Sequence, residues 1–468
     1  MKKNPKNFKI HFIGIGGIGM SGIAEIMHDL GYNVQGSDIK CNENTKRLKQ
    51  KGVNVFIGHK SQNIKFAKAV VYSSAIKQNN IEIKESKKNK IPLFTRADML
   101  AELMKTKKSI AVAGSHGKTT TTSLIGNILD EAKYDPTIIN GGIINSYSKN
   151  NKYGRGEWMV AEADESDGSF LRLPHQISII TNIDIEHLDY YKNKENLFKA
   201  FELFIQNLPF YGTTIICVDD KNLKKIEKKI NNRNVITYSM RNKSADVFID
   251  NIYIKDNLTN FSILLNKQIS KYRGNFNYSI QTIGNHNVLN GCASIIAAFL
   301  VGVKNKYIKK ALKNYIGVKR RFTFLGKVNN AFIYDDYAHH PTEIAATLLA
   351  AKKINKKIVI IFQPHRYSRT NLLMMQFVNV LSKVNTLYIL NTYSAGEKPI
   401  KKATSKILHK NLLKKNNNVK YIQNQKLLNK LIIKNTFEKS IIIFMGAGSI
   451  TRIAQKFMKD NDRKIKKN

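Results

Sequence analysis

Short apolar runs alternate with amphipathic segments through the first hundred residues. The run at 9–16 (KIHFIGIG) has the length and content of a buried strand, and residues 19–31 (GMSGIAEIMHDLG) repeat apolar positions at helical spacing before a terminal glycine. Further strand patterns follow at 33–38 and 67–76. Because buried strands that alternate with helices pair in parallel, we expect a parallel sheet here.

A second series of apolar runs begins near residue 108. Its strands are expected in KSIAVAG, EWMVAEADESDGSF and ISIITNIDIEHLDYY, where each apolar run ends abruptly in glycine, polar or acidic residues. Ligands of parallel sheets bind at the carboxyl ends of the strands, so we expect these three endings to converge. Residues 219–280 differ, because DVFIDNIYI and NFSILL within them alternate apolar and polar positions, which predicts a small antiparallel sheet at the edge of this domain.

Four strand-then-loop units follow a junction at GVKRRFTFLGKV. They are AFIYDDYAHHP, KIVIIFQPHRYSRT, TLYILNTYSAGEKP and SIIIFMGAGSITRIAQ. The whole pattern predicts an α/β protein of three domains, at 1–106, 107–318 and 319–468. The first and third are expected to be Rossmann-like, and the second combines a parallel sheet with the antiparallel one.

A glycine loop joins the first expected strand to the first helix. Gly14, Gly16 and Gly19 form G-x-G-x-x-G, and Asp38 lies about twenty residues further on. This pattern indicates a cradle for a diphosphate. By itself it is also what a nicotinamide-dependent oxidoreductase would have.

A second glycine loop, GSHGKTTT at 114–121, also joins a strand to a helix. Its backbone N–H groups and the helix N-terminus are suited to phosphates. Lys118 is expected to reach the β- and γ-phosphates of a nucleotide, and the Thr119 hydroxyl to ligate Mg²⁺. Val112 stands where the strict P-loop pattern has its first glycine.

Carboxylates gather at the end of the next expected strand, in EADESD. Such a charge run is commonly only solvated, but a carboxylate beside a P-loop is also what holds Mg²⁺. Glu162, nearest the apolar run, is the best candidate, and His187 is a possible second ligand whose other interpretation is purely structural.

Two further motifs carry polar side chains at element ends. In GNHNVLN, His286 and Asn290 fit either a capped helix or recognition of adenine, and the residues do not separate these interpretations. DDYAHHP and QPHRYSRT bring carboxylate, imidazole and guanidinium groups to two strand ends. Because arginines bind carboxylates in a bidentate fashion and no third metal ligand follows at helical spacing, we favour carboxylate binding over zinc.

The net charge of +43 over 468 residues first suggests a nucleic acid or an anionic membrane as partner. Lysine, however, is scattered along the chain together with asparagine and isoleucine, which favours codon bias over a binding stripe. The three cysteines form no C-x-x-C pair, and no apolar run reaches the ~20 residues that span a bilayer. We therefore expect a cytoplasmic protein with neither nucleic-acid partner nor membrane insertion.

Taken in order, these motifs resemble those of the Mur ligases, the ATP-dependent amino-acid-adding enzymes of peptidoglycan synthesis. The resemblance runs nearly end to end and includes GIGGIGMSGIAEI, AGSHGKTTT, EADESDGSF, TNIDIEH, GNHNVLN, DDYAHHPTE and FQPHRYSRT. It implies three domains, for a UDP-sugar, for ATP with Mg²⁺, and for the incoming amino acid. The implied reaction joins L-alanine to the lactyl carboxylate of UDP-N-acetylmuramate through an acyl phosphate.

The resemblance also implies roles for individual residues. The catalytic residues are expected to be Lys118, Glu162, His187 and His339, with Thr119, Glu162 and His187 on the metal. ATP is expected to contact Gly114, Ser115, His116, Gly117, Lys118, Thr119, Thr120, His286, Asn290 and Asp336. The UDP-sugar is expected to contact Gly14, Gly16, Gly17, Gly19, Met20, Ser37, Asp38 and Ser74, and the amino acid Tyr337, His339, Arg366 and Arg369.

Other functions explain parts of the same sequence. A family member that adds a peptide instead of alanine shares the architecture. A nicotinamide oxidoreductase explains the first glycine loop but not the P-loop, and a nucleic-acid-stimulated ATPase explains the charge and the P-loop but not DDYAHHP or HRYSRT. The expected oligomeric state is a monomer or a weak homodimer.

Overall fold

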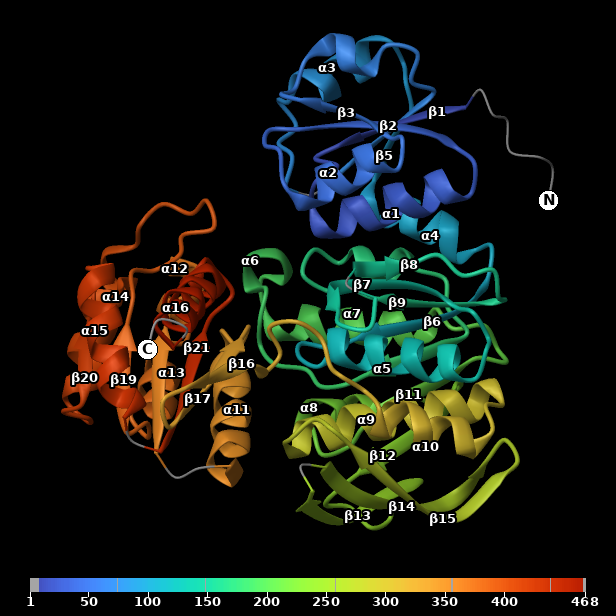
Figure 1. Ribbon diagram of the computed structural model, residues 1–468. Helices are drawn as coiled ribbons and strands as arrows, with labels where there is room; N and C mark the ends of the chain where they lie inside the picture. Colours follow the sequence, from blue (N-terminus) through green and yellow to red (C-terminus); the bar gives the residue numbers. More distant parts are fainter. Residues whose placement is uncertain are drawn as a thin grey trace. The chain divides into compact units, whose positions relative to one another are not determined.

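The computed structural model describes residues 8–73, 75–147, 149–256, 258–354, 357–437 and 439–465, and the chain forms two compact units (Figure 1). The first unit contains residues 1–282 and 287–317. The second contains residues 283–286 and 318–468.

The first unit begins with the expected parallel sheet, drawn in blue in Figure 1. Its five strands lie in the order β3-β2-β1-β4-β5, with the most buried strand, β1, at the centre. The strands are β1 (Lys9–Ile13), β2 (Asn33–Asp38), β3 (Asn54–Ile57), β4 (Ala69–Tyr72) and β5 (Leu93–Thr95). The helices are α1 (Ile18–Asp29), α2 (Glu43–Gln50), α3 (Ile81–Lys88) and α4 (Arg96–Met104), with a 3-10 turn at Ser61–Ile64.

A ten-stranded sheet forms the rest of the first unit, in the order β15-β14-β13-β12-β11-β10-β6-β9-β7-β8. The strands are β6 (Lys108–Ala113), β7 (Thr137–Ile144), β8 (Lys149–Lys152), β9 (Trp158–Glu162), β10 (Ile177–Ile180), β11 (Thr213–Cys217), β12 (Asn234–Ser239), β13 (Val247–Lys255), β14 (Leu258–Ile269) and β15 (Tyr272–Ile280). The helices are α5 (Lys118–Glu131), α6 (Leu188–Tyr191), α7 (Lys194–Gln206), α8 (Lys221–Glu227), α9 (Asn285–Val301) and α10 (Asn305–Lys313), with a 3-10 turn at Ser169–Arg172.

The predicted antiparallel strands are present at one edge of the large sheet, and residues 219–280 also contain α8 and the parallel strand β12, which the sequence analysis did not separate. β13 pairs with β12 in parallel and with β14 antiparallel, so one strand belongs to both patterns. Nearer the middle of the sheet, Val112 on β6 lies opposite Glu162 on β9, and Ala113 opposite Ile180 on β10. The carboxyl ends of these three strands therefore lie side by side, as the sequence predicts.

The second unit is a six-stranded sheet in the order β16-β17-β21-β18-β19-β20, in which the β16–β17 pair is antiparallel. The strands are β16 (Thr323–Val328), β17 (Ala331–Asp336), β18 (Ile358–Phe362), β19 (Thr386–Ile389), β20 (Val419–Tyr421) and β21 (Ser440–Met445). The helices are α11 (Pro341–Ile354), α12 (Tyr367–Leu372), α13 (Met374–Leu381), α14 (Ser405–Leu413), α15 (Gln425–Thr436) and α16 (Ile450–Ile465), with a 3-10 turn at Lys401–Ala403.

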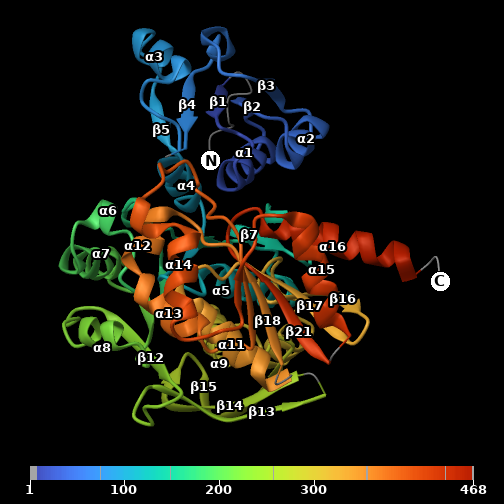
Figure 2. The same cartoon turned by 90° about the vertical axis from the view of Figure 1, so that its left-hand side faces the viewer.

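Helices cover both faces of this second sheet. Ile441 and Ile443 of β21 pack into a core with α11, α13 and α14, whereas Ile442 and Phe444 pack into another core with α15 and α16. Figure 2 shows the two groups of helices on opposite sides of β18 and β21. Burial on both faces explains why β21 is a continuous apolar run.

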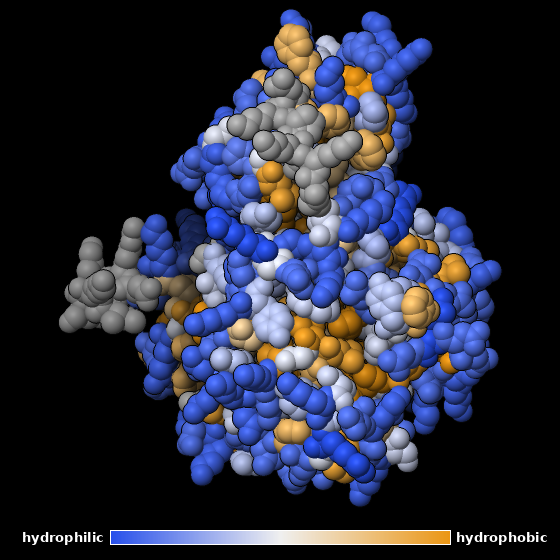
Figure 3. All heavy atoms as spheres, turned by 90° about the vertical axis from the view of Figure 1, so that its right-hand side faces the viewer, coloured by the Kyte–Doolittle hydropathy of each residue, from blue (hydrophilic) through white to orange (hydrophobic). Residues whose placement is uncertain are grey.

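In the described part of the chain, no helix has the length and apolar content that crossing a membrane requires. On the face drawn in Figure 3, most side chains are hydrophilic and apolar ones lie among them.

One buried histidine of the first unit makes stability depend on pH. His175 is 4% exposed, stacks on Phe204 with ring centroids 4.3 Å apart, and burial lowers its pKa to about 4. The unfolded chain, with a histidine pKa near 6.5, binds more protons between pH 6.5 and 4. The unfolding free energy is therefore expected to fall as the pH drops through this window, by about 1 kcal/mol per pH unit from this residue.

A His175→Phe variant isolates this contribution, because the new ring keeps the stacking without the titrating group. Denaturant unfolding at pH 7, 6 and 5 is expected to show a shallower loss of stability in the variant than in the parent protein. Equal slopes would contradict the assignment to His175.

Candidate functional site

The first glycine loop is shaped by bonds to the end of β2. The carbonyl of Ser37 accepts hydrogen bonds from the amides of Gly14 (2.8 Å) and Ile15 (3.0 Å), and Gly14 has a φ of +79°. The amide of Gly16 donates to Asp38 Oδ2 at 2.9 Å. Asp38, the last residue of β2, thus contacts the loop through its carboxylate at the carboxyl edge of the sheet.

The predicted UDP-sugar residues gather at this edge, although two side chains turn inward. Met20 is 2% exposed within the hydrophobic core, and the Ser37 hydroxyl is fully buried. Gly19 lies beside Arg96, since a Cβ at Gly19 would be 3.1 Å from Arg96 Cδ. Gly17 caps the start of α1. Ser74 falls outside the described residues.

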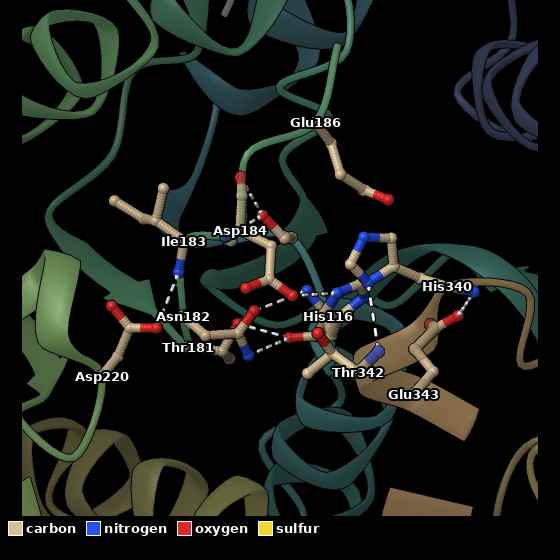
Figure 4. Close-up of polar contacts among 12 residues, drawn as sticks. His116, Thr181, Asn182, Ile183, Asp184, Glu186, Asp220, His340, Thr342 and Glu343 are labelled. Carbon is tan, nitrogen blue, oxygen red and sulfur yellow. Dashed lines mark hydrogen bonds and ion pairs between the residues drawn. The ribbon is translucent and has the colours of Figure 1, made fainter. Parts of the chain in front are cut away.

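The P-loop between β6 and α5 is held in place by the loop that follows β10. Asn182 accepts a bond from the His116 amide at 2.8 Å and donates one to the His116 carbonyl at 2.9 Å, as Figure 4 shows. Its carbonyl accepts the Ser115 amide at 3.0 Å. With these two amides engaged, the N–H groups at the start of α5, from Lys118 to Thr120, remain the helix-terminal donors suited to phosphate.

Two further hydrogen bonds, made by the side chain and the backbone of Asp184, also hold the P-loop in place. His116 Nε2 donates to Asp184 Oδ2 at 2.8 Å (Figure 4). The Asp184 amide donates to Ser115 Oγ, also at 2.8 Å. Asn182 and Asp184 belong to TNIDIEH, a motif in which the sequence pointed only to His187. Asn182 and Asp184 could have been found as polar residues that directly follow an apolar strand next to the P-loop.

Asp184→Asn is expected to weaken the binding of a nucleoside triphosphate at this loop about fivefold, because the loss of charge from the bond to His116 is worth about 1 kcal/mol. Binding is expected to weaken but not to be lost, since the loop keeps its bonds to Asn182. Calorimetric titration with ATP checks this, with Asp189→Asn, an exposed neighbour on α6, as the matched control. Equal dissociation constants in the two variants would contradict the prediction.

Lys118 lies among the carboxylates that end β9. Its Nζ is 3.0 Å and 2.8 Å from the two oxygens of Glu165 and 2.5 Å from the Gly114 carbonyl. Burial lowers the pKa of Lys118, but the charges of Glu165, Glu162 and Asp164 outweigh it and hold the pKa above its usual value. The ammonium group is therefore kept charged beside the P-loop.

Glu162 and His187 lie near this lysine. Glu162 Oε2 accepts the Gly141 amide at 2.7 Å, and His187 Nε2 is 4.0 Å from Glu165 Oε1. Thr119, in the first turn of α5, is 5% exposed. A hydroxyl and a carboxylate at adjoining strand and helix ends are oxygen donors of the kind that Mg²⁺ takes together with substrate phosphates, so the residues present fit this ion.

Asn290 and His286 belong to different units. Asn290, on α9, packs against the P-loop, since a Cβ at Gly117 would be 2.6 Å from Asn290 Oδ1. His286 belongs to the second unit, where burial and then the charge of Arg321 lower its pKa to about 4.

In the second unit, aromatic and cationic side chains meet at the ends of β17 and β18. The rings of Tyr337 and His339 have centroids 5.2 Å apart, and His339 lies 5.7 Å from His365. Arg369 Nη1 is 3.4 Å from His365 Nδ1, and Tyr393 stacks on His365 at 5.5 Å. Burial, followed by the nearby His339 and arginines, lowers the pKa of His365 to about 3.

Two predicted residues of this unit have clear local roles. Arg366 is the N-cap residue of α12 with a φ of +68°, an uncommon conformation for a non-glycine residue. Asp336 is buried and accepts bonds from the Thr347 hydroxyl and the Ala338 amide. Tyr393 is a cluster member that the sequence analysis did not single out.

Two glycine loops at the carboxyl ends of parallel strands, one of them a P-loop beside carboxylates, define a nucleotide-binding α/β protein. Family models for the Mur ligase catalytic domain, middle domain and glutamate ligase domain match residues 9–108, 112–298 and 320–448. The chain belongs to the Mur ligase family.

Individual relatives agree with this assignment. A UDP-N-acetylmuramate–L-alanine ligase of Rickettsia typhi is 47% identical over 97% of this chain and 92% of the relative. One from Parvibaculum lavamentivorans is 44% identical over 94% and 90%. The crystal structure of the UDP-N-acetylmuramate–alanine ligase of Thermotoga maritima has a TM-score of 0.81 and 28% identity, covering 97% of this chain and 99% of that one.

Proposed function

We propose that this protein joins L-alanine to the lactyl carboxylate of UDP-N-acetylmuramate, with conversion of ATP to ADP and phosphate. The observation that carries the proposal is the 44% to 47% identity, over nearly the whole chain, to relatives named for this reaction. The reaction is the first amino-acid addition in peptidoglycan precursor synthesis.

The chemistry needs an activated carboxylate, because a free carboxylate is a poor electrophile. Transfer of the γ-phosphoryl group of ATP to the lactyl carboxylate gives an acyl phosphate. The neutral amine of L-alanine then attacks the acyl carbon, and phosphate leaves from the tetrahedral intermediate. Fixed positive charge at the transferring group is the main contribution that a protein makes to such a step.

We assign this charge to Lys118, which the Glu165 carboxylate holds at the P-loop. ATP is proposed to contact Gly114, Ser115, His116, Gly117, Lys118, Thr119, Thr120, His286, Asn290 and Asp336. Thr119, Glu162 and His187 are proposed to hold Mg²⁺. When bound, the ion supplies further positive charge next to the phosphates.

The UDP-sugar is proposed to bind the first glycine loop, where backbone amides at the start of α1 suit a diphosphate. The proposed contacts are Gly14, Gly16, Gly17, Gly19, Met20, Ser37, Asp38 and Ser74. For Met20 and Ser37, whose side chains face inward, a contact is proposed through the backbone.

The amino acid is proposed to bind Tyr337, His339, Arg366 and Arg369, with arginine on its carboxylate. The base that accepts the proton of the ammonium group is proposed to be His339, or His187 where Thr119 and Glu162 alone hold the metal. Replacing the responsible histidine with alanine is expected to change the pH–rate profile. Because the reaction consumes ATP and a sugar nucleotide, we propose that the protein acts in the cytoplasm.

A coupled ADP-release assay tests the function. ADP is expected only when UDP-N-acetylmuramate, ATP, Mg²⁺ and L-alanine are all present. Release with a tripeptide in place of alanine would point to the peptide-adding member of the family. Release that rises with DNA or RNA and needs no sugar nucleotide would contradict the proposal.

A further inference from the structure

A buried carboxylate lies beneath the first glycine loop and has no part in the mechanism above. Glu82, in the first turn of α3, is fully buried. It accepts hydrogen bonds from Ser37 Oγ and Asn63 Nδ2, both at 2.6 Å. The ring nitrogens His59 Nδ1 and His11 Nε2 lie 3.2 Å and 3.4 Å from its Oε2.

These donors come from two strands of the first sheet and from the segment that follows a third strand. His11 is on β1, Ser37 is the residue before the last of β2, and His59 and Asn63 follow β3. Burial raises the pKa of Glu82, but the bonds from His11, Ser37 and Asn63 outweigh it and hold the pKa below its usual value. The carboxylate is therefore charged, and a buried charge is tolerated only with such partners.

Ser37 connects this carboxylate to the glycine loop. Its hydroxyl is bonded to Glu82, while its carbonyl accepts the amides of Gly14 and Ile15. Ile13, the residue before the loop, lies directly opposite Ser37 in the β1–β2 pair. Ser37 thus bonds the buried carboxylate through its side chain and the backbone of the glycine loop through its carbonyl.

We propose that Glu82 is a positioning residue for the nucleoside diphosphate of the UDP-sugar. It fixes Ser37, and through the Ser37 carbonyl it holds the Gly14–Ile15 backbone in the shape that presents the loop to a diphosphate. The inference rests on the proposed function, because it takes the first loop as the sugar-nucleotide site. Polar groups that hold a binding loop from beneath matter for affinity without touching the ligand.

Glu82→Gln tests this role, because the amide keeps the size of the side chain and removes its charge and one acceptor. Calorimetry with UDP and with UDP-N-acetylmuramate is expected to show at least tenfold weaker binding. In the ADP-release assay the KM for the sugar nucleotide is expected to rise by the same factor, while kcat and the KM for ATP stay within twofold. A purely structural loss would lower kcat and impair ATP binding as well.

Glu85→Gln, one turn further along α3, is the matched control, since Glu85 is half-buried and its side chain accepts a hydrogen bond from Asn89, the residue that caps the end of α3. It is expected to bind like the parent protein. If Glu82→Gln does not fold, Ser37→Ala is expected to weaken UDP-N-acetylmuramate binding at least threefold, because it removes the hydroxyl that bonds Glu82 and His59 and leaves the Ser37 carbonyl in place.

Unchanged sugar-nucleotide binding in folded Glu82→Gln, or in Ser37→Ala, would overturn the inference and leave the proposed function intact. Equal losses for ATP and for the sugar nucleotide would also overturn it. A parent protein that binds no UDP-N-acetylmuramate would refute the proposed function and the inference together.

Discussion

Lys118→Met is expected to lower kcat at least about a hundredfold, as loss of fixed positive charge at a transferring group does in other enzymes. It is also expected to destabilise the protein by about 3–5 kcal/mol, because Glu165 is left as a buried carboxylate without its ion-pair partner. Steady-state ADP release and denaturant unfolding measure the two effects separately.

The double variant Lys118→Met/Glu165→Gln separates these two roles of the lysine. Removing both charges of a buried pair is expected to restore most of the stability, whereas activity stays low. Lys194→Met, an exposed lysine of the same unit, is the control and is expected to match the parent protein. Activity that returns together with stability in the double variant would contradict a direct role of Lys118 in phosphoryl transfer.

Gly114→Ala is expected to abolish ATP binding and to cost several kcal/mol of stability. A Cβ at this position would lie 2.3 Å from Thr181 Oγ1 and 2.9 Å from the Asn182 carbonyl oxygen, and the φ of Gly114 is +121°. Neither neighbour moves freely, because Thr181 and Asn182 also bond His116. Thermal unfolding with and without ATP is the measurement.

Gly302→Ala is the control, because it introduces the backbone strain of a positive φ without a steric clash. Gly302 has a φ of +91° with no atom within 4 Å of an added Cβ, so the cost is expected to be only about 1 kcal/mol, with ATP binding retained. A Gly114→Ala protein that is as stable as Gly302→Ala and still binds ATP would contradict the steric argument.

The strands and helices, and the clustering of the candidate site residues at strand ends, could be predicted from local sequence patterns. Apolar runs closed by glycine or acidic residues predict both the strands and the edge where ligands bind, which is why Lys118 and Glu162 were expected near one another and lie so. The domain boundaries and the residue roles stay predictions.

Contacts between segments far apart in the sequence could not be predicted in the same way. Glu82 lies 45 residues from Ser37, and only the folded sheet brings the two together. Nor does a glycine-loop pattern reveal that Met20 faces the core or that Ser37 turns its hydroxyl inward. Likewise, strand alternation predicts β13–β15 but not that they extend the parallel sheet, since that depends on the β12–β13 pairing.

If a diphosphate binds the first loop as proposed, the bond from the Gly16 amide to Asp38 makes that binding an exchange of hydrogen-bond acceptors. A phosphate oxygen that takes this amide displaces a carboxylate of the protein, so one anion replaces another at the same donor. Only the difference between the two bonds then contributes to affinity. The Asp38 carboxylate thus competes with the ligand for the Gly16 amide. It bonds this amide while the ligand is absent, and it can bond the amide again when the ligand leaves.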